Sequence, residues 1–256
     1  MRTYPLSLAV LSAWACACTA PAEPSGDESA SSESSAMQDT LEQRRSPVFP
    51  AAAHPFGHDM VDWSRRWWKW VYGIPAESNP WFDSAGADCA IDQSGPVWFL
   101  ASVSAPGGVA TITRSCTLPE GKAIFVALEG LLNDYPCPDP SFKPAPGQSL
   151  YDFLRDGAAQ TVESVNGLSL TVDGQNAADP FSYRFTSPHL FHITGDPSLT
   201  AKLDGCITGS SQPAVSDGHF MMVKPLEAGN HTLIVHSTDP HNDVTVVWNL
   251  TVTECR

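Results

Sequence analysis

The sequence predicts a mainly β protein, a β-sandwich of jelly-roll or immunoglobulin-like character with two packed α-helices. Residues 97–253 hold roughly nine short apolar runs separated by turn-forming residues, a spacing typical of sandwich strands. Only two segments of the chain have apolar residues that recur with the period of an α-helix. Such elements bury one face of each strand and one stripe of each helix, which favours a layered fold.

The first predicted helix lies in residues 58–81, which hold five of the eight tryptophans. On a helix, Trp63, Trp67 and Trp70 fall at i, i+4 and i+7 and form one apolar stripe. Each buried tryptophan removes roughly 150–250 Å² from water, so three of them suffice to anchor a sheet face. Helix-bounding residues flank the stripe: Asp59 as N-cap, and Gly73 and Pro75 at the end.

The second predicted helix spans residues 149–163. Ser149 begins a capping box with Asp152, and apolar residues follow at helical spacing. Strands are predicted at residues 97–103, 109–114, 123–129, 168–172, 183–185, 190–193, 219–224, 231–236 and 244–253. Residues 133–148, which are rich in proline, and residues 195–216 are predicted to be loops.

Residues 1–18 have the features of an export signal, because a basic residue precedes a short apolar run and then small residues. Cys16 and Cys18 each follow a small-x-small pattern, so either is a candidate for lipidation, as in bacterial lipoproteins. Lipoprotein signals favour leucine three residues before that cysteine, where this chain has Ala13 or Ala15. Plain secretion is the alternative. The apolar run is too short to span a bilayer, so membrane attachment is expected only through a lipid anchor.

Residues 19–47 are rich in Ser, Ala, Glu and Pro and have almost no large apolar groups, a composition that predicts a disordered tether. Residues 48–256 then form one domain that is long enough to bury a core. The whole chain has 28 acidic and 14 basic residues, a net charge of −14. This balance argues against nucleic acid and against anionic lipid surfaces as partners.

The five cysteines of the domain form no CxxC motif, so disulfides are expected rather than a zinc site. We expect Cys89 to pair with Cys116, because a loop and a strand between them can bring them together. Cys137 with Cys206 is the second expected pair and leaves Cys255 unpaired. A pair between Cys206 and Cys255 is the alternative.

Three motifs stand out along the domain: Trp63-Ser64-x-Arg66-Trp67-Trp68-x-Trp70, Gly95-Pro96-Val97-Trp98-Phe99-Leu100-Ala101 and Cys116-Thr117-Leu118-Pro119-x-Gly121-Lys122-Ala123. Together they resemble a family of uncharacterised bacterial exported, lipoprotein-like proteins, and the resemblance covers nearly all of the domain. It implies secretion or lipid anchoring. It implies no activity for any residue of this chain.

Tryptophan rings stack on sugar rings, so the aromatic segment is a candidate carbohydrate-binding platform. The regular stripe of the helix is expected in the core instead. Trp68 and Trp81 fall outside that stripe, on the side that also carries the basic residues or beyond the helix. They are therefore the candidate binding residues.

Oxygen ligands collect in residues 237–243, between two predicted strands. Calcium prefers such clusters, which makes Asp239, Asn242 and Asp243 a candidate site. The same residue types are the ordinary chemistry of turns, and that interpretation is favoured. No cofactor is therefore predicted, and calcium is kept only as the alternative.

Catalytic signals are weak, and no catalytic residue is assigned. The histidines form no HxH or HExxH motif, so a transition-metal site needs convergence across strands, for example of His219 with His231 or His236. There is no GxSxG elbow. A glycosidase needs two facing carboxylates, for which Glu129 and Asp134 are the candidates.

These features predict an exported protein of the cell envelope, lipid-anchored or secreted, that acts as a non-catalytic binding module for a polysaccharide or a protein partner. The alternative is a secreted enzyme that acts on polysaccharide or depends on a metal. An exposed Trp68 or Trp81 favours binding, whereas a groove with two facing carboxylates or three histidines favours catalysis.

Overall fold

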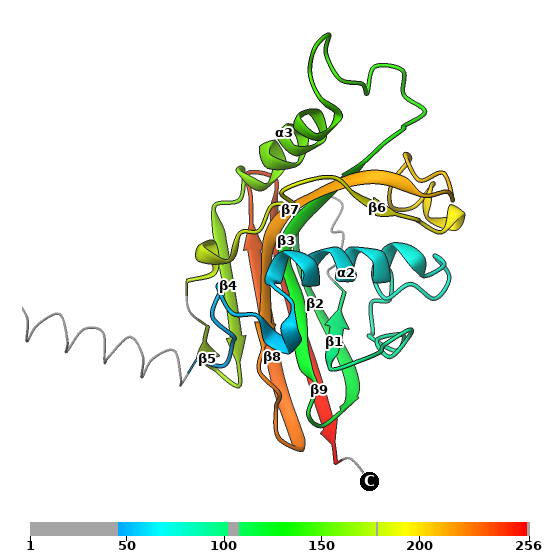
Figure 1. The fold of residues 1–256 in the computed structure, drawn as a ribbon. Helices are drawn as coiled ribbons and strands as arrows, with labels where there is room; N and C mark the ends of the chain where they lie inside the picture. The colour runs from blue at the N-terminus through cyan, green and yellow to red at the C-terminus, as the bar shows by residue number, and fades with distance from the viewer. Residues whose placement is uncertain (1–45, 102–107, 178, 255–256) are drawn as a thin grey trace, which may run out of the picture. The chain divides into compact units, whose positions relative to one another are not determined.

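The computed structural model describes residues 46–101, 108–177 and 179–254 (Figure 1). These ranges contain two α-helices, α2 (Met60–Gly73) and α3 (Leu150–Val162). They also contain the strands β1 (Val97–Leu100), β2 (Gly108–Pro119), β3 (Ala123–Asp134), β4 (Gly167–Val172), β5 (Gln175–Asn176), β6 (Phe191–Ile193), β7 (Gln212–Val223), β8 (Gly229–Thr238) and β9 (Asn242–Thr253). The predicted signal with Cys16 and Cys18, the predicted tether up to residue 45, and Cys255 lie outside the described residues.

The strands form two sheets that pack face to face. Sheet A has the strand order β1-β3-β7-β6, and sheet B has the order β2-β9-β8-β4-β5. The pairs β1–β3 and β2–β9 are parallel, and the other pairs are antiparallel. Side chains from both sheets fill the space between them, among them Val126 and Met221 of sheet A and Leu233 and Trp248 of sheet B. The predicted mainly β sandwich is confirmed.

Helix α2 covers the other face of sheet A, so the central strands β3 and β7 are buried on both faces (Figure 1). Phe220 of β7 is the centre of this contact, with ring centroids 6.2 Å from Trp67 and 5.8 Å from Phe125. Helix α3 packs against β3 and β7 as well. The domain therefore has three layers, which are α2, sheet A and sheet B.

The predicted tryptophan stripe of α2 is confirmed. The carboxylate of Asp59 caps the helix by accepting a hydrogen bond from the backbone N–H of Asp62, at 2.7 Å. All three stripe tryptophans are buried, and each indole N–H donates to a backbone carbonyl: Trp63 to Pro55 at 3.1 Å, Trp67 to Leu100 at 2.9 Å and Trp70 to Ile91 at 2.9 Å. Burial and hydrogen bonds together fix the helix on the sheet.

The second helix is confirmed too, with Ser149 as its N-cap. The predicted strand at residues 183–185 is wrong, because the chain there ends a 3₁₀-helix, η2 (Pro180–Tyr183), and then makes a single bridge from Arg184 to His219. Among the described residues, no helix has the length and hydropathy needed to cross a membrane.

The predicted loop at residues 195–216 is wrong at its end, because β7 begins at Gln212. The first residues of this strand look polar, yet Ser216 and Asp217 are fully buried. Asp217 accepts two hydrogen bonds from the guanidinium of Arg184, at 2.6 and 3.1 Å. Polar side chains can be buried in a strand when they are hydrogen-bonded in this way. The pattern of apolar residues in the sequence does not reveal such a strand.

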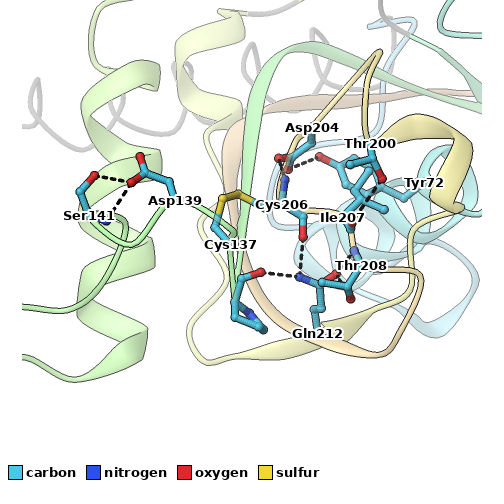
Figure 2. Close-up of a disulfide and its surroundings, with 11 residues drawn as sticks. Tyr72, Cys137, Asp139, Ser141, Thr200, Asp204, Cys206, Ile207, Thr208 and Gln212 are labelled. Atoms are coloured by element: carbon cyan, nitrogen blue, oxygen red, sulfur yellow. Dashed lines mark hydrogen bonds between the residues drawn. A yellow bond between two sulfur atoms is a disulfide. The ribbon is translucent and has the colours of Figure 1, made fainter.

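Both disulfides are the pairs that the sequence favours. Cys89 is bonded to Cys116 with the Cα atoms 5.9 Å apart, which ties the long loop after α2 to β2. Cys137 is bonded to Cys206 with the Cα atoms 4.2 Å apart, which joins the loop after β3 to the loop before β7 (Figure 2). The alternative pair of Cys206 with Cys255 is excluded in this structure, because Cys206 already has its partner.

Candidate functional site

A cavity of about 260 Å³ lies beside β3, at the point where β1 ends. The pairing of β1 with β3 stops at Leu100 and Val126, and residues 127–130 of β3 line the cavity. The other lining residues are Trp67, Trp68, Trp81, Ala101, Val126, Val235, Ser237, Asp239, Asn242, Val244, Val246 and Trp248. We call this cavity the aromatic pocket. Its walls come from α2, from β3 and from strands β8 and β9 of sheet B.

Both candidate binding tryptophans line the aromatic pocket. Trp68 is only 3% exposed, although the sequence places it on the solvent side of α2. Its side chain is therefore buried on that side of the helix. Its ring lies 4.8 Å from Trp67 and 6.0 Å from Trp81, centroid to centroid. The rings therefore pack on one another. They are not an exposed flat platform, but the wall of a pocket.

Trp81 is partly buried and is held by its backbone. Its N–H donates to the side chain of Asn79 at 2.9 Å, and its carbonyl accepts from Arg114 at 3.2 Å. Arg114 also donates to the carbonyl of Ala101 at 3.1 Å and lies 5.3 Å from the ring of Trp248. This buried arginine thus positions three pocket residues, and nothing in the sequence pattern distinguishes it.

Burial lowers the pKa of Arg114 to about 10, although nearby Asp83 acts in the opposite direction. The guanidinium is still charged at neutral pH. It contributes a positive charge behind the ring of Trp248, where cation–π attraction is favourable.

Three polar atoms of pocket-lining residues have no hydrogen-bond partner in the described part of the chain. They are the indole N–H groups of Trp68 and Trp81 and Oδ1 of Asn242. A buried polar atom without a partner costs about 1–3 kcal/mol. All three atoms are themselves buried, so the folded protein carries this cost at residues that line the pocket.

Glu129 is one of two acidic residues that line the pocket. It lies at a bulge in the pairing of β3 with β7, a feature that re-aims side chains. Its Oε2 accepts a hydrogen bond from the hydroxyl of Ser237, at 3.0 Å. The pKa of Glu129 is raised, mainly because the carboxyl group is buried. Hydrogen bonds from Ser237 and from the backbone of Gly130 lower the pKa in part, and the negative charge of Asp239 raises it further.

Asp239 also lines the pocket, and its pKa moves in the opposite direction. Burial raises the pKa of Asp239, but hydrogen bonds from the side chain of Asn242 and from the backbone of His241 and Asn242 outweigh it, so that the pKa is lowered. The distances of these hydrogen bonds are 2.7–3.0 Å. Asp239 is therefore the ionised carboxylate of the pocket, and Glu129 the carboxyl group that keeps its proton to a higher pH.

The proposed calcium ligands are only partly brought together. Asn242 and Asp239 lie in one turn and bond to each other, whereas Asp243 turns to His236, with its Oδ1 2.9 Å from the imidazole Nε2. These contacts are ordinary turn chemistry. Calcium at this turn stays a prediction.

The other catalytic hypotheses do not match the geometry. Glu129 and Asp134 are five residues apart on β3, so they point to opposite faces and do not form a facing pair. The described histidines do not converge on one point: His219 lies beside Phe181, while His231 and His236 pair with separate aspartates. Asp134 belongs to a different cluster, in which burial and then the charge of Asp204 raise its pKa to about 7.

No family model matches the chain, and no curated protein matches it. A chain from the solved structure of PbICP-C in complex with falcipain-2 matches over 62% of this chain and 100% of its own length, with 12% sequence identity and a TM-score of 0.22. A TM-score this low carries no argument about fold or function.

Replacing Glu129 with glutamine tests the electrostatics of the pocket. Because the folded protein holds the pKa of Glu129 above the unfolded value of about 4.3, this group stabilises the fold fully below that pH, and its contribution is lost as the pH rises through the folded pKa. We expect Glu129→Gln to be more stable than the wild type at pH 8, by on the order of 1 kcal/mol, and little different at pH 4. Urea unfolding at both pH values measures this.

The matched control is Glu77→Gln, which changes an exposed glutamate. It should unfold like the wild type at both pH values. An equal pH dependence in Glu129→Gln and wild type would show that Glu129 is ordinarily solvated, contrary to the geometry described above.

Proposed function

We propose that the protein is an exported, non-catalytic module that binds a sugar unit of a polysaccharide in the aromatic pocket. The observation that carries this proposal is the combination, in one cavity of about 260 Å³, of tryptophan rings with the hydrogen-bonding groups of Glu129, Ser237 and Asn242. A sugar ring has an apolar C–H face and a rim of hydroxyl groups. An aromatic cavity with a few convergent polar groups suits both.

The charge of the pocket favours an uncharged sugar. Asp239 is ionised, and Glu129 resists ionisation because it is buried near Asp239. An acidic sugar would add a further negative charge beside these two carboxyl groups, at a cost that a neutral hydroxyl does not meet. When Glu129 is protonated, its carboxyl group can both donate to and accept from hydroxyl groups; when it is ionised, it only accepts.

Export is supported by two observations of different kinds. The domain contains two disulfides, which are typical of oxidising compartments outside the cytosol. The chain also begins with the features of an export signal, including Cys16 and Cys18 as candidate lipidation sites.

The test is a binding measurement on the full chain. We expect retention on one or more insoluble polysaccharides, and saturable quenching of tryptophan fluorescence by a soluble oligosaccharide of the same type. Trp81→Ala should weaken binding at least about tenfold, because it removes one aromatic wall of the pocket.

Phe82→Ala is the matched control. Phe82 is the next aromatic residue in the chain, is 37% exposed, and lies outside the pocket lining. Its removal should leave binding unchanged. Failure of the protein to bind any glycan, or equal binding by Trp81→Ala and wild type, would overturn the proposal.

One observation favours a second candidate, a polysaccharide-active enzyme. Glu129 and Asp239 line one pocket, and their pKa values shift in opposite directions, which is the pattern of an acid and a base that share a site. Release of reducing ends from a bound polysaccharide by the wild type, but not by Glu129→Gln or Asp239→Asn, would replace the binding module with this enzyme. Binding without release of products supports the non-catalytic module.

A further inference from the structure

A second group of acidic side chains, Asp134 and Asp204, lies away from the aromatic pocket. Figure 2 shows Asp204 beside the Cys137–Cys206 disulfide. Asp134 is the last residue of β3, and Asp204 belongs to the loop before β7. One oxygen from each carboxylate and the sulfur of Cys206 lie within 4.8 Å of one another. We call these residues, with Tyr72, the Asp134 cluster.

The two carboxylates of the cluster differ in their partners. Asp204 accepts a hydrogen bond from the backbone N–H of Cys206 at 2.8 Å, and another from the hydroxyl of Tyr72 at 3.3 Å (Figure 2). Asp134 is only 2% exposed, yet its Oδ1 has no hydrogen-bond partner among the described residues. A buried carboxylate that has an unpartnered oxygen and lies within 4.8 Å of a second carboxylate is a costly arrangement unless a proton or a cation lies between them.

Neighbouring contacts hold the cluster in place. The side-chain amide of Gln212 donates to the carbonyls of Pro136 and Cys206, at 3.0 and 2.9 Å, and so bridges the two loops that the disulfide joins (Figure 2). No ion pair in the described ranges includes Asp134 or Asp204. The disulfide and Gln212 thus hold the two loops together, and no cationic side chain in the described ranges forms an ion pair with Asp134 or Asp204.

We propose that the Asp134 cluster binds a calcium ion through the carboxylates of Asp134 and Asp204. The donor set decides the class of metal. Cys206 is in a disulfide and offers no thiolate, and no histidine belongs to the group, so the available donors are hard oxygens. Hard oxygen donors from separate segments suit Ca²⁺, which accepts irregular geometry and completes its shell with water.

Such an ion links three parts of the fold. It lies where the end of β3, the loop before β7 and Tyr72 of α2 meet. Binding to the folded state alone stabilises that state by mass action. The proposal does not depend on the aromatic pocket, and either can fail without the other.

The experiment uses the full chain after removal of metals with a chelator. We expect Tb³⁺ to bind with one equivalent per chain and to show luminescence sensitised by the nearby Tyr72, and Ca²⁺ to displace it. Calcium should also raise the midpoint of thermal unfolding. Asp134→Asn and Asp204→Asn should each weaken binding at least tenfold and abolish the thermal shift, while keeping the circular dichroism spectrum of the wild type.

Two matched variants serve as controls. Asp139→Asn changes an exposed carboxylate of the adjacent loop that accepts hydrogen bonds from Ser141 (Figure 2). Asp239→Asn changes the turn that the sequence suggests for calcium. Both should bind like the wild type. The proposal is overturned by the absence of saturable Tb³⁺ or Ca²⁺ binding at millimolar concentration, by equal binding in Asp134→Asn and wild type, or by a loss of binding in Asp239→Asn alone.

Discussion

Replacing Trp67 with alanine is expected to lower the free energy of unfolding by about 3–5 kcal/mol. Trp67 is fully buried, and its ring contacts those of Trp68, Trp81 and Phe220. The substitution leaves a cavity between α2 and sheet A, and it also deprives the carbonyl of Leu100 of its donor at 2.9 Å. Guanidinium unfolding followed by circular dichroism measures the change.

Phe82→Ala is again the useful comparison, because it removes an aromatic ring that is 37% exposed. It should cost less than about 1 kcal/mol. If Trp67→Ala lowered the free energy of unfolding as little as Phe82→Ala, the packing of α2 on the outer face of sheet A would contribute little to stability, contrary to our expectation.

Removing either disulfide is expected to have an effect of similar size. Loss of the Cys89–Cys116 bond, which closes a loop with a separation of 27 residues, should cost about 3–4 kcal/mol. Loss of the Cys137–Cys206 bond, with a separation of 69 residues, should cost about 4–5 kcal/mol, because a longer loop gains more chain entropy when it is released. Paired cysteine-to-alanine variants and urea unfolding measure both.

A reducing agent provides the control for these variants. Under full reduction the wild type should fall to the stability of the variant without both bonds, while that variant should be unaffected. A wild type whose unfolding midpoint did not change on complete reduction would contradict the expected contribution of both disulfides.

The sequence predicted those elements whose signals are local. The stripe of Trp63, Trp67 and Trp70, with Asp59 before it, specifies α2 within one segment, and the alternation of β9 does the same for a strand. The Cys89–Cys116 bond was predictable because a loop and a strand between the two cysteines can bring them together, whereas the sequence favoured Cys137–Cys206 but left Cys206–Cys255 as an alternative. For α2 and β9 the information lies in neighbouring residues.

The aromatic pocket could not be predicted, because its residues come from distant segments. Ser237 bonds to Glu129 across 108 residues of sequence, and no local pattern places β8 next to β3. Helix periodicity assigned Trp68 to the exposed side of α2. It contains no information about Trp81, which comes from the loop after the helix and packs against the ring of Trp68. The polar start of β7 was missed for a related reason, since its partners Ser187 and Arg184 lie on another loop.

The position of β9 has a consequence for how the molecule is made. This last strand lies between β2 and β8 and is paired with β2 in parallel along twelve residues of each strand. Until residues 242–253 have been synthesised, β2 has no neighbour in sheet B, and Trp248 is missing from the interior. Sheet B therefore cannot be completed before β9 has been synthesised. Because pairing across such a long separation is slow, the chain passes through a period in which apolar strands are exposed and in need of protection from aggregation.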